Sequence, residues 1–295
     1  MSRIAGRFRE LREAGRTALV PFVTAGDPGP EITVPLMHAM VAAGADLVEL
    51  GVPFSDPMAD GPVIQKANER ALAGGMSLRR TVELVAEFRR DDERTPVVLM
   101  GYLNPLECMG YEAFAAAAGA AGVDGVITVD LTPEESGPIG RAFAAENIDA
   151  IYLLAPTSSD RRIANVCKVA GGFVYYVSLK GVTGSAALDV EDVAWHLERI
   201  RALSDLPVGV GFGIRDPESA ARVSVLSDAV IVGSVLVNEI EALAHTPQAI
   251  PEALAAKLAA MRGAMDGAGA PDTAARAPKR PATVAGGPDA AERPA

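Results

Sequence analysis

Two acidic residues flank a proline-rich loop in the first quarter of the chain. Glu49 lies in the apolar segment Asp46–Leu50, which has the composition of a buried strand. Asp60 lies at the far end of the loop, directly before a Gly-Pro pair and a stretch with helical spacing. A carboxylate inside an apolar strand costs free energy unless its surroundings are polar, paired or functional, and two carboxyl groups in different environments can divide acid and base work. Glu49 and Asp60 are therefore candidate catalytic residues, whereas Asp56 between them is explained equally well as a turn residue.

The elements that would position this loop repeat a strand-then-helix cycle eight times. The expected strands are Val/Ile/Leu runs without polar alternation, which is typical of parallel strands buried on both faces. They are Ala18–Thr24, Asp46–Leu50, Val97–Met100, Gly125–Val129, Ala150–Leu154, Phe173–Ser178, Pro207–Val210 and Ala229–Val232. The expected helices are Glu31–Ala43, helices across Val63–Arg90, Tyr111–Ala121, Pro133–Glu146, Asp160–Ala170, Val190–Leu203, Pro217–Val225 and segments through Met261.

This near-regular spacing predicts an α/β fold, a closed (β/α)₈ TIM barrel, with an extra amphipathic helix over Ile4–Glu13 that could close one end. A doubly wound sheet is the rival, but no GxGxxG follows the first strand. The barrel domain is expected to span residues 1–262. Residues 263–295 are rich in Ala, Pro and Gly and hold no aromatic residue, so they are predicted to form a disordered tail.

Composition limits the kind of protein. The chain has 295 residues, nearly half of them apolar, and a net charge of −11, which argues against nucleic acid or an anionic membrane surface as the main partner. No apolar run reaches the roughly 18 residues of a membrane span. The basic N-terminus is not followed by an apolar secretion segment, and Cys108 and Cys167 lack CxxC spacing. We therefore expect a cytoplasmic protein.

Glycines follow each of the last three expected strands and predict a phosphate site. They lie in Gly181–Gly184, Gly211–Ile214 and Gly233–Leu236, and the last of these stretches opens a helix. Barrels commonly hold phosphate with the loops after strands seven and eight and a short helix N-terminus. Glycine lets backbone N–H groups approach an anion closely, and a helix N-terminus adds about half a positive charge. The absence of a GxxxxGK[ST] run disfavours a nucleoside triphosphate.

Seven stretches together resemble the family of tryptophan synthase α subunits over roughly Phe8 to Ala244, in order and in spacing. They are Pro21–Pro28, Glu49–Pro62, Met100–Pro105, Tyr175–Ser178, Gly181–Gly184, Gly211–Ile214 and Val232–Ser234. The resemblance implies a lyase of tryptophan biosynthesis, which cleaves indole-3-glycerol phosphate by a retro-aldol reaction to indole and glyceraldehyde 3-phosphate. It maps the catalytic carboxylates onto Glu49, the general acid and then base, and Asp60, the acceptor of a hydrogen bond from the indole N–H.

The same resemblance assigns the remaining site residues. Tyr175 would lie close to the two acids, and Thr183 would hydrogen-bond to Asp60 when the loop after the sixth strand closes. The residues implied as walls of the indole pocket are Phe22, Met100, Tyr102 and Phe212. Those implied in phosphate binding are Gly184, Gly213, Gly233 and Ser234.

The resemblance also implies a partner. It is a β subunit that carries pyridoxal phosphate and receives indole through a tunnel in an αββα heterotetramer, with the loop Pro53–Asp60 as a docking element. No cofactor is expected in this chain. The histidines His38, His196 and His245 lie on expected helices without metal-ligand spacing, so no metal is expected either. A Schiff-base aldolase is disfavoured because no lysine lies at a strand end.

Two alternatives stay open: a stand-alone lyase that releases free indole, and a catalytically weak α chain that mainly activates β. Two departures from the family pattern affect the loops. Lys180 replaces a small hydroxylic residue in the closing loop, where its charge could change closure, and Thr132 replaces a proline, which is expected to loosen the turn after Asp130.

Overall fold

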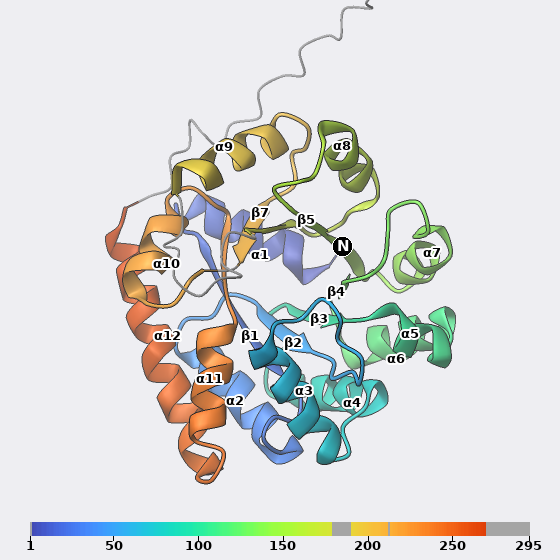
Figure 1. The fold of residues 1–295 in the computed structure, drawn as a ribbon, viewed down its shortest axis with the longest axis vertical. Coiled ribbons are helices and arrows are strands. Elements are labelled where there is room, and N and C mark those ends of the chain that lie inside the picture. Colours follow the sequence, from blue (N-terminus) through green and yellow to red (C-terminus); the bar gives the residue numbers. More distant parts are fainter. Residues whose placement is uncertain (1, 179–189, 212, 270–295) are drawn as a thin grey trace, which may run out of the picture.

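In the computed structural model, eight parallel strands form a closed barrel in the order of the sequence, β1 to β8. The structure describes residues 2–178, 190–211 and 213–269. The strands are β1 (Ala18–Thr24), β2 (Val48–Gly51), β3 (Val97–Gly101), β4 (Gly125–Thr128), β5 (Asp149–Leu154), β6 (Val174–Val177), β7 (Val208–Gly211) and β8 (Ala229–Val232). The predicted TIM barrel is confirmed, and Figure 1 shows the helices arranged around the strands.

All the helices but α1 (Arg3–Glu13), which closes one end, lie around the outside of the barrel. The others are α2 (Pro30–Ala42), α3 (Pro62–Ala73), α4 (Leu78–Phe88), α5 (Leu103–Met109), α6 (Tyr111–Ala121), α7 (Gly137–Ala145), α8 (Asp160–Val169), α9 (Val190–Arg201), α10 (Pro217–Ser224), α11 (Ser234–Ala242) and α12 (Ile250–Gly267), with a 3₁₀ turn η1 (Pro247–Ala249). No helix in the described ranges is long and apolar enough to span a membrane.

Most expected elements are confirmed, and the differences are local. The helix α5 was not expected, and α7 begins at Gly137 rather than Pro133 because Thr132–Ser136 form hydrogen-bonded turns. The helix α12 continues past Gly263, where the tail was expected to begin. Its extension is anchored because Met265 is buried and Asp266 pairs with arginines, so the boundary at residue 262 lies too early. Residues 270–295 lie outside the described residues.

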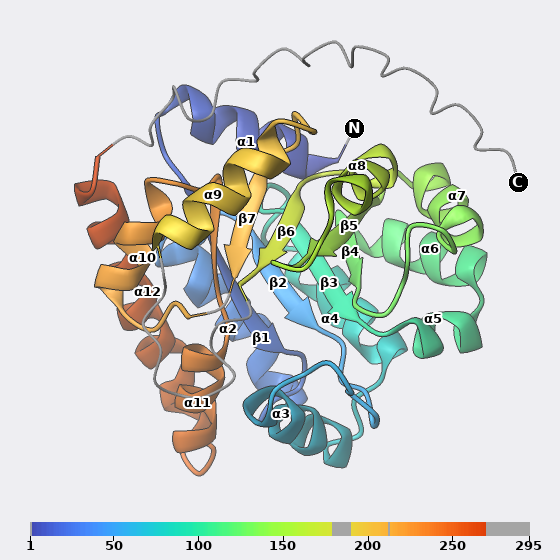
Figure 2. The ribbon, with the colours of Figure 1, turned by 45° about the horizontal axis from the view of Figure 1, so that its top comes forward.

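The core has two large parts and a small third one, which lies at the candidate site. One large part fills the barrel interior with side chains that point inward from alternate positions of the strands, among them Val20, Ile127 and Ile231. The other large part lies between the strands and the surrounding helices. The helix α1 closes one end of the interior with Ile4 and Phe8, and Figure 2 shows it lying across the barrel. That end is closed where the strands begin, which leaves the loops at the carboxyl ends of the strands to form a site.

Candidate active site

Glu49 lies on β2 and is almost completely buried, with 1% of its surface exposed. It pairs in register with Phe22 on β1 and Val98 on β3, so its backbone lies between two neighbouring strands. Burial raises the pKa of Glu49 to about 8 because water no longer stabilises the charged form. Its Oε2 atom accepts no hydrogen bond from any described residue. Glu49 is therefore a protonated acid at neutral pH with one oxygen uncommitted.

Asp60 ends the loop that follows β2 and is only partly buried. Burial raises the pKa of its carboxyl group to about 6, and hydrogen bonds from Tyr102 and Asn68 oppose that rise. The Asn68 amide donates to Oδ2 at 3.4 Å, and Gln65 donates to the backbone carbonyl of Asp60 at 2.8 Å. At neutral pH Asp60 is thus mostly ionised while Glu49 is mostly protonated. The two predicted carboxyl groups carry the different protonation states that a division of labour needs.

Tyr175 lies on β6 inside the barrel, with 6% of its surface exposed. Burial and the neighbouring charge of Glu49 raise the pKa of its hydroxyl well above the usual value. Gly211 on β7 makes room for this ring, because a Cβ at that position would collide with the Tyr175 hydroxyl. Tyr175 therefore lies within the electrostatic range of Glu49, and its part in the site, which the family resemblance implies, stays a prediction.

An apolar wall lies beside the acids. Phe22 and Met100 form a cluster with residues of α3 and α11, which are Val63, Ile64, Ala67 and Val237. Gly51 leaves space for the ring, since a Cβ there would lie 2.8 Å from Phe22 Cζ. The Phe22 ring also lies next to the start of α11, because a Cβ on Gly233 would lie 3.6 Å from Phe22 Cδ1. The apolar wall and the predicted phosphate glycine are therefore neighbours.

The described part of the predicted phosphate site consists of Gly213, Gly233 and Ser234. Gly213 has a φ of +79°, a left-handed conformation that favours glycine. Gly233 is the N-cap of α11, and Ser234 is its exposed first residue. Their positions at the carboxyl ends of β7 and β8 are those at which barrels hold phosphate. Thr183, Gly184 and Phe212 lie outside the described residues.

Comparison with known proteins gives the family. The family described as "Tryptophan synthase alpha chain" matches residues 8–266. The chain belongs to this family. A relative from Thioalkalivibrio sulfidiphilus, a tryptophan synthase alpha chain, is 66% identical over 249 residues, which cover 84% of this chain and 94% of the relative. Another, from Nitrosococcus oceani, is 60% identical over 252 residues and covers 85% and 93%.

Solved structures of the family agree in fold. Tryptophan synthase subunit alpha from Legionella pneumophila matches with a TM-score of 0.85 and 45% identity, covering 90% of this chain and 99% of that one. A chain of tryptophan synthase from M. tuberculosis in its aminoacrylate-bound form matches with a TM-score of 0.79 and 35% identity, covering 90% and 100%.

Asn68 and Gln65 are residues of the site that the sequence analysis missed. Both lie inside α3, where an amide side chain carries no signal of its own. The hydroxyl of Tyr102, expected only in a pocket wall, also takes part in the polar surroundings of Asp60: it accepts a hydrogen bond from the Ala59 N–H at 3.0 Å and acts to lower the pKa of Asp60. The amide and the phenol together hold the Asp60 end of the family's signature loop.

Two residues, Thr132 and Lys180, depart from the family pattern, and Thr132 lies among the described residues. Thr132 Oγ1 donates to Glu135 Oε2 at 2.8 Å, and the Glu135 N–H donates to the Thr132 carbonyl at 3.1 Å. Asp130 accepts a hydrogen bond from the Leu103 N–H at 2.8 Å and so caps α5. The turn expected to be loose therefore holds two hydrogen bonds of its own. Lys180 lies outside the described residues.

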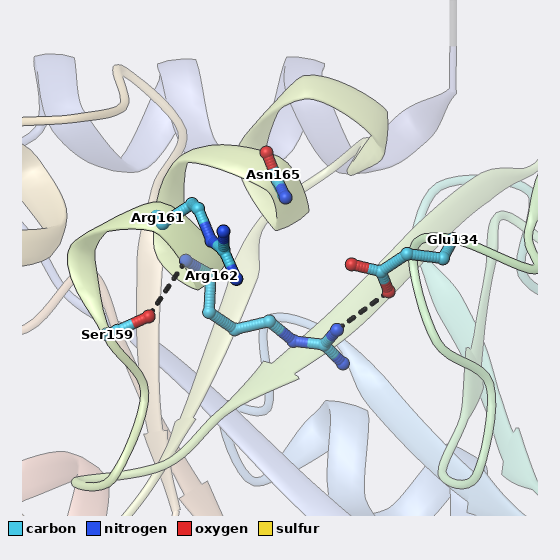
Figure 3. A pocket seen from close by; sticks show the side chains of 5 residues that line it. All are labelled: Glu134, Ser159, Arg161, Arg162 and Asn165. Carbon is cyan, nitrogen blue, oxygen red and sulfur yellow. Dashed lines mark hydrogen bonds and ion pairs between the residues drawn. The ribbon is translucent and has the colours of Figure 1, made fainter. Parts of the chain in front are cut away.

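A separate hollow of about 360 Å³ lies between the loop after β4 and the start of α8. Figure 3 shows its lining, which is Glu134, Ser159, Arg161, Arg162 and Asn165. Arg162 pairs with Glu134 at 2.8 Å, and its backbone N–H donates to Ser159. The lining contains neither catalytic candidate. No group of three or more potential metal-binding side chains occurs among the described residues.

Proposed function

We propose that this chain cleaves indole-3-glycerol phosphate to indole and glyceraldehyde 3-phosphate, as the α subunit of tryptophan synthase. The observation that carries the proposal is Glu49, a buried carboxyl group whose pKa is raised to about 8 and whose Oε2 has no partner among the described residues. The carbon–carbon bond cannot break while the indole ring is aromatic, so C3 must first be protonated. A carboxylic acid that stays protonated at neutral pH can supply that proton.

Glu49 then serves twice. Its proton goes to C3 of the ring, and the resulting carboxylate takes the proton of the glycerol hydroxyl next to the ring. The oxygen's electron pair forms the aldehyde carbonyl, and the pair of the breaking bond restores the aromatic indole. The acid therefore returns to its protonated form, and no net proton is consumed. Burial serves this exchange, because it keeps the two forms close in free energy near neutral pH.

Asp60 stabilises the charge that forms in between. Protonation at C3 makes the ring nitrogen cationic, and an ionised carboxylate can accept its N–H hydrogen bond. With a pKa of about 6, Asp60 is ionised at the pH at which Glu49 is protonated. Phe22, Met100 and Tyr175 would hold the ring, and Gly213, Gly233 and Ser234 would hold the phosphate through backbone N–H groups and a hydroxyl.

The proposed partner is a tryptophan synthase β subunit in an αββα heterotetramer. That subunit would carry pyridoxal phosphate, whereas the steps above use side chains of this chain alone. The loop Pro53–Asp60 is the proposed contact, and its Met58 is 86% exposed. We also propose that the chain is cytoplasmic, because the proposed reaction belongs to the biosynthesis of an amino acid.

Release of indole from indole-3-glycerol phosphate tests the proposal. The purified chain is assayed alone and with a β subunit of a close relative. We expect slow release alone and strong stimulation by β. Fast release that β does not change would favour a stand-alone lyase, and negligible release in both assays, with β activity raised, would favour an activating chain. No release and no effect on β would contradict the proposed function.

A further inference from the structure

The helix α3 presents two amide side chains to the same residue. Gln65 donates to the backbone carbonyl of Asp60 at 2.8 Å, and Asn68, three positions further on, donates to the carboxylate Oδ2 at 3.4 Å. Residues three apart lie on one face of a helix, so both amides point at the end of the loop. Gln65 thus binds the main chain of Asp60, and Asn68 binds its carboxylate group.

Asn68 is a buried polar residue with 4% of its surface exposed. Burying an amide costs free energy unless it is hydrogen-bonded, so its position in the helix needs a partner. The bond to Asp60 is long, and hydrogen bonds at catalytic groups commonly shorten as charge develops on the substrate. Because an amide neither gains nor loses a proton in the working range, Asn68 donates equally well at every pH.

The far end of α3 is fixed to two other parts of the site. Arg70 makes a two-pronged ion pair with Asp27, at 2.7 and 2.9 Å, in the loop after β1. The same guanidinium contacts Glu241 on α11 at 3.2 Å. Asp27 has no exposed side-chain surface, so this pair is well shielded from solvent. Figures 1 and 2 show α3 beside α11, and the helix is therefore a rigid support for Asn68.

Among the described residues, the titratable group that meets Asp60 is Tyr102. Burial, with a contribution from the charge of Asp60, raises the pKa of the Tyr102 hydroxyl to about 12, so it stays a neutral donor at working pH. The carboxylate of Asp130 acts in the same direction on Tyr102. Two neutral donors from different elements, Asn68 and Tyr102, therefore oppose the effect of burial on Asp60.

We propose that Asn68 is a positioning residue, which keeps Asp60 ionised and turned toward the substrate. The consequence for turnover rests on the proposed function, whereas the effect on the ionisation of Asp60 does not. Removing the Asn68 amide should remove one of the two groups that oppose the effect of burial on the pKa of Asp60. The pKa of Asp60 should then rise, and the enzyme should lose activity on the acid side of its pH profile.

The test compares four variants with the unaltered chain by two methods. Asn68→Leu removes the donor at similar volume, Asn68→Ala removes it without adding bulk, and Asn68→Thr keeps a hydroxyl donor. Gln65→Leu is the matched control, because it removes the amide that binds only the main chain of Asp60. The pKa of Asp60 is measured by NMR in chains labelled with ¹³C at the aspartate carboxyl carbons, with the signal assigned through Asp60→Asn. Indole release is measured from pH 5.5 to 8.5.

We expect Asn68→Leu to raise the pKa of Asp60 by about half to one unit. With a full unit, kcat would fall roughly threefold at pH 6.5 and approach the unaltered value near pH 8. Asn68→Thr should keep the pKa of Asp60 close to its value in the unaltered chain, because a donor remains. Gln65→Leu should change KM or thermal stability while leaving the pKa of Asp60 in place. If Asn68→Leu does not fold, Asn68→Ala carries the same expectation.

An unchanged pKa of Asp60 in the folded Asn68 variants would overturn the proposal and leave Asn68 a structural role. So would an equal shift in Gln65→Leu. The NMR titration needs no substrate. If the unaltered chain failed to cleave indole-3-glycerol phosphate, the proposed function would fall, while the titration would still decide the role of Asn68.

Discussion

The two ends of the barrel bury acidic side chains under opposite conditions. Where the strands begin, Asp124 receives hydrogen bonds from Arg3, Arg89 and the Val97 N–H, and Asp46 receives them from arginines and from the Leu19 N–H. Where the strands end, Glu49 is equally buried, yet its Oε2 has no partner among the described residues. Paired acids at one end tie neighbouring strands together, whereas at the other end burial keeps Glu49, whose Oε2 has no partner among the described residues, mostly protonated.

The comparison shows how one fold separates stability from chemistry. A buried carboxylate with arginine partners ties together the elements that supply those partners, and removing one partner is costly. A buried carboxyl group without such partners costs stability when it ionises, and that cost is the source of its raised pKa. In (β/α)₈ barrels the amino ends of the strands serve stability and the carboxyl ends carry the active site. In this chain the arginine-paired Asp46 and Asp124 lie where the strands begin, and the candidate catalytic acids lie toward the other end.

Glu49→Gln gives the largest expected effect. The amide keeps the shape of the side chain but has no acidic proton, so we expect kcat for indole release to fall by about a thousandfold or more. The variant should remain folded, because it removes a group that is costly to ionise. Steady-state assays with and without β, beside a thermal melt, measure both. Substantial residual turnover would remove Glu49 from the proton-transfer role.

Asp124→Asn tests the other end of the barrel. It leaves Arg3 and Arg89 without their carboxylate, and the Arg89 side chain is only 10% exposed. Breaking a buried pair by removing one partner should cost about 3 kcal/mol of the free energy of unfolding. Denaturant unfolding measures the loss, and kcat per folded molecule should stay unchanged. A fall in kcat as large as that of Glu49→Gln would break the division between the two ends.

The pH dependence of stability should expose the unpaired acid. The folded-state pKa of Glu49 is raised to about 8 from an ordinary 4.5, so between these values the folded chain binds more protons than the unfolded one. The free energy of unfolding therefore decreases as pH rises through this window. We expect Glu49→Gln to remove a decrease of roughly 2 kcal/mol between pH 6 and 7.5. Parallel curves for the variant and the unaltered chain would contradict this.

The sequence was sufficient for most of the fold because the strands are distinct apolar runs. It failed where local composition misleads. The helix α5 has only seven residues, with Pro105 inside it and Gly110 after it. The end of α12 resembles a linker, because Gly263 and Gly267 interrupt it. Its place in the barrel domain depends on tertiary contacts, which are the burial of Met265 and the ion pair of Asp266 with Arg16.

Some residues of the candidate site stand out in the sequence, and others do not. Glu49 stands out in the sequence because a charge inside an apolar strand is anomalous, and Asp60 because it ends an unusual loop; their catalytic roles stay predictions. Asn68 could not, since an asparagine on a helix is common and its partner depends on how α3 lies against the loop. The role of the Tyr102 hydroxyl was hidden for the same reason, because its bonds cross from the end of β3 to the loop after β2.

The ionisation of Glu49 tests the account most directly. An NMR titration of the chain labelled with ¹³C at the glutamate carboxyl carbons, with the signal assigned through Glu49→Gln, measures it without substrate or partner. We expect a pKa near 8, so that the group is mainly protonated at pH 7. A pKa near the ordinary value of 4.5 would mean that Glu49 is charged at neutral pH, and the proposed acid would have no proton to give.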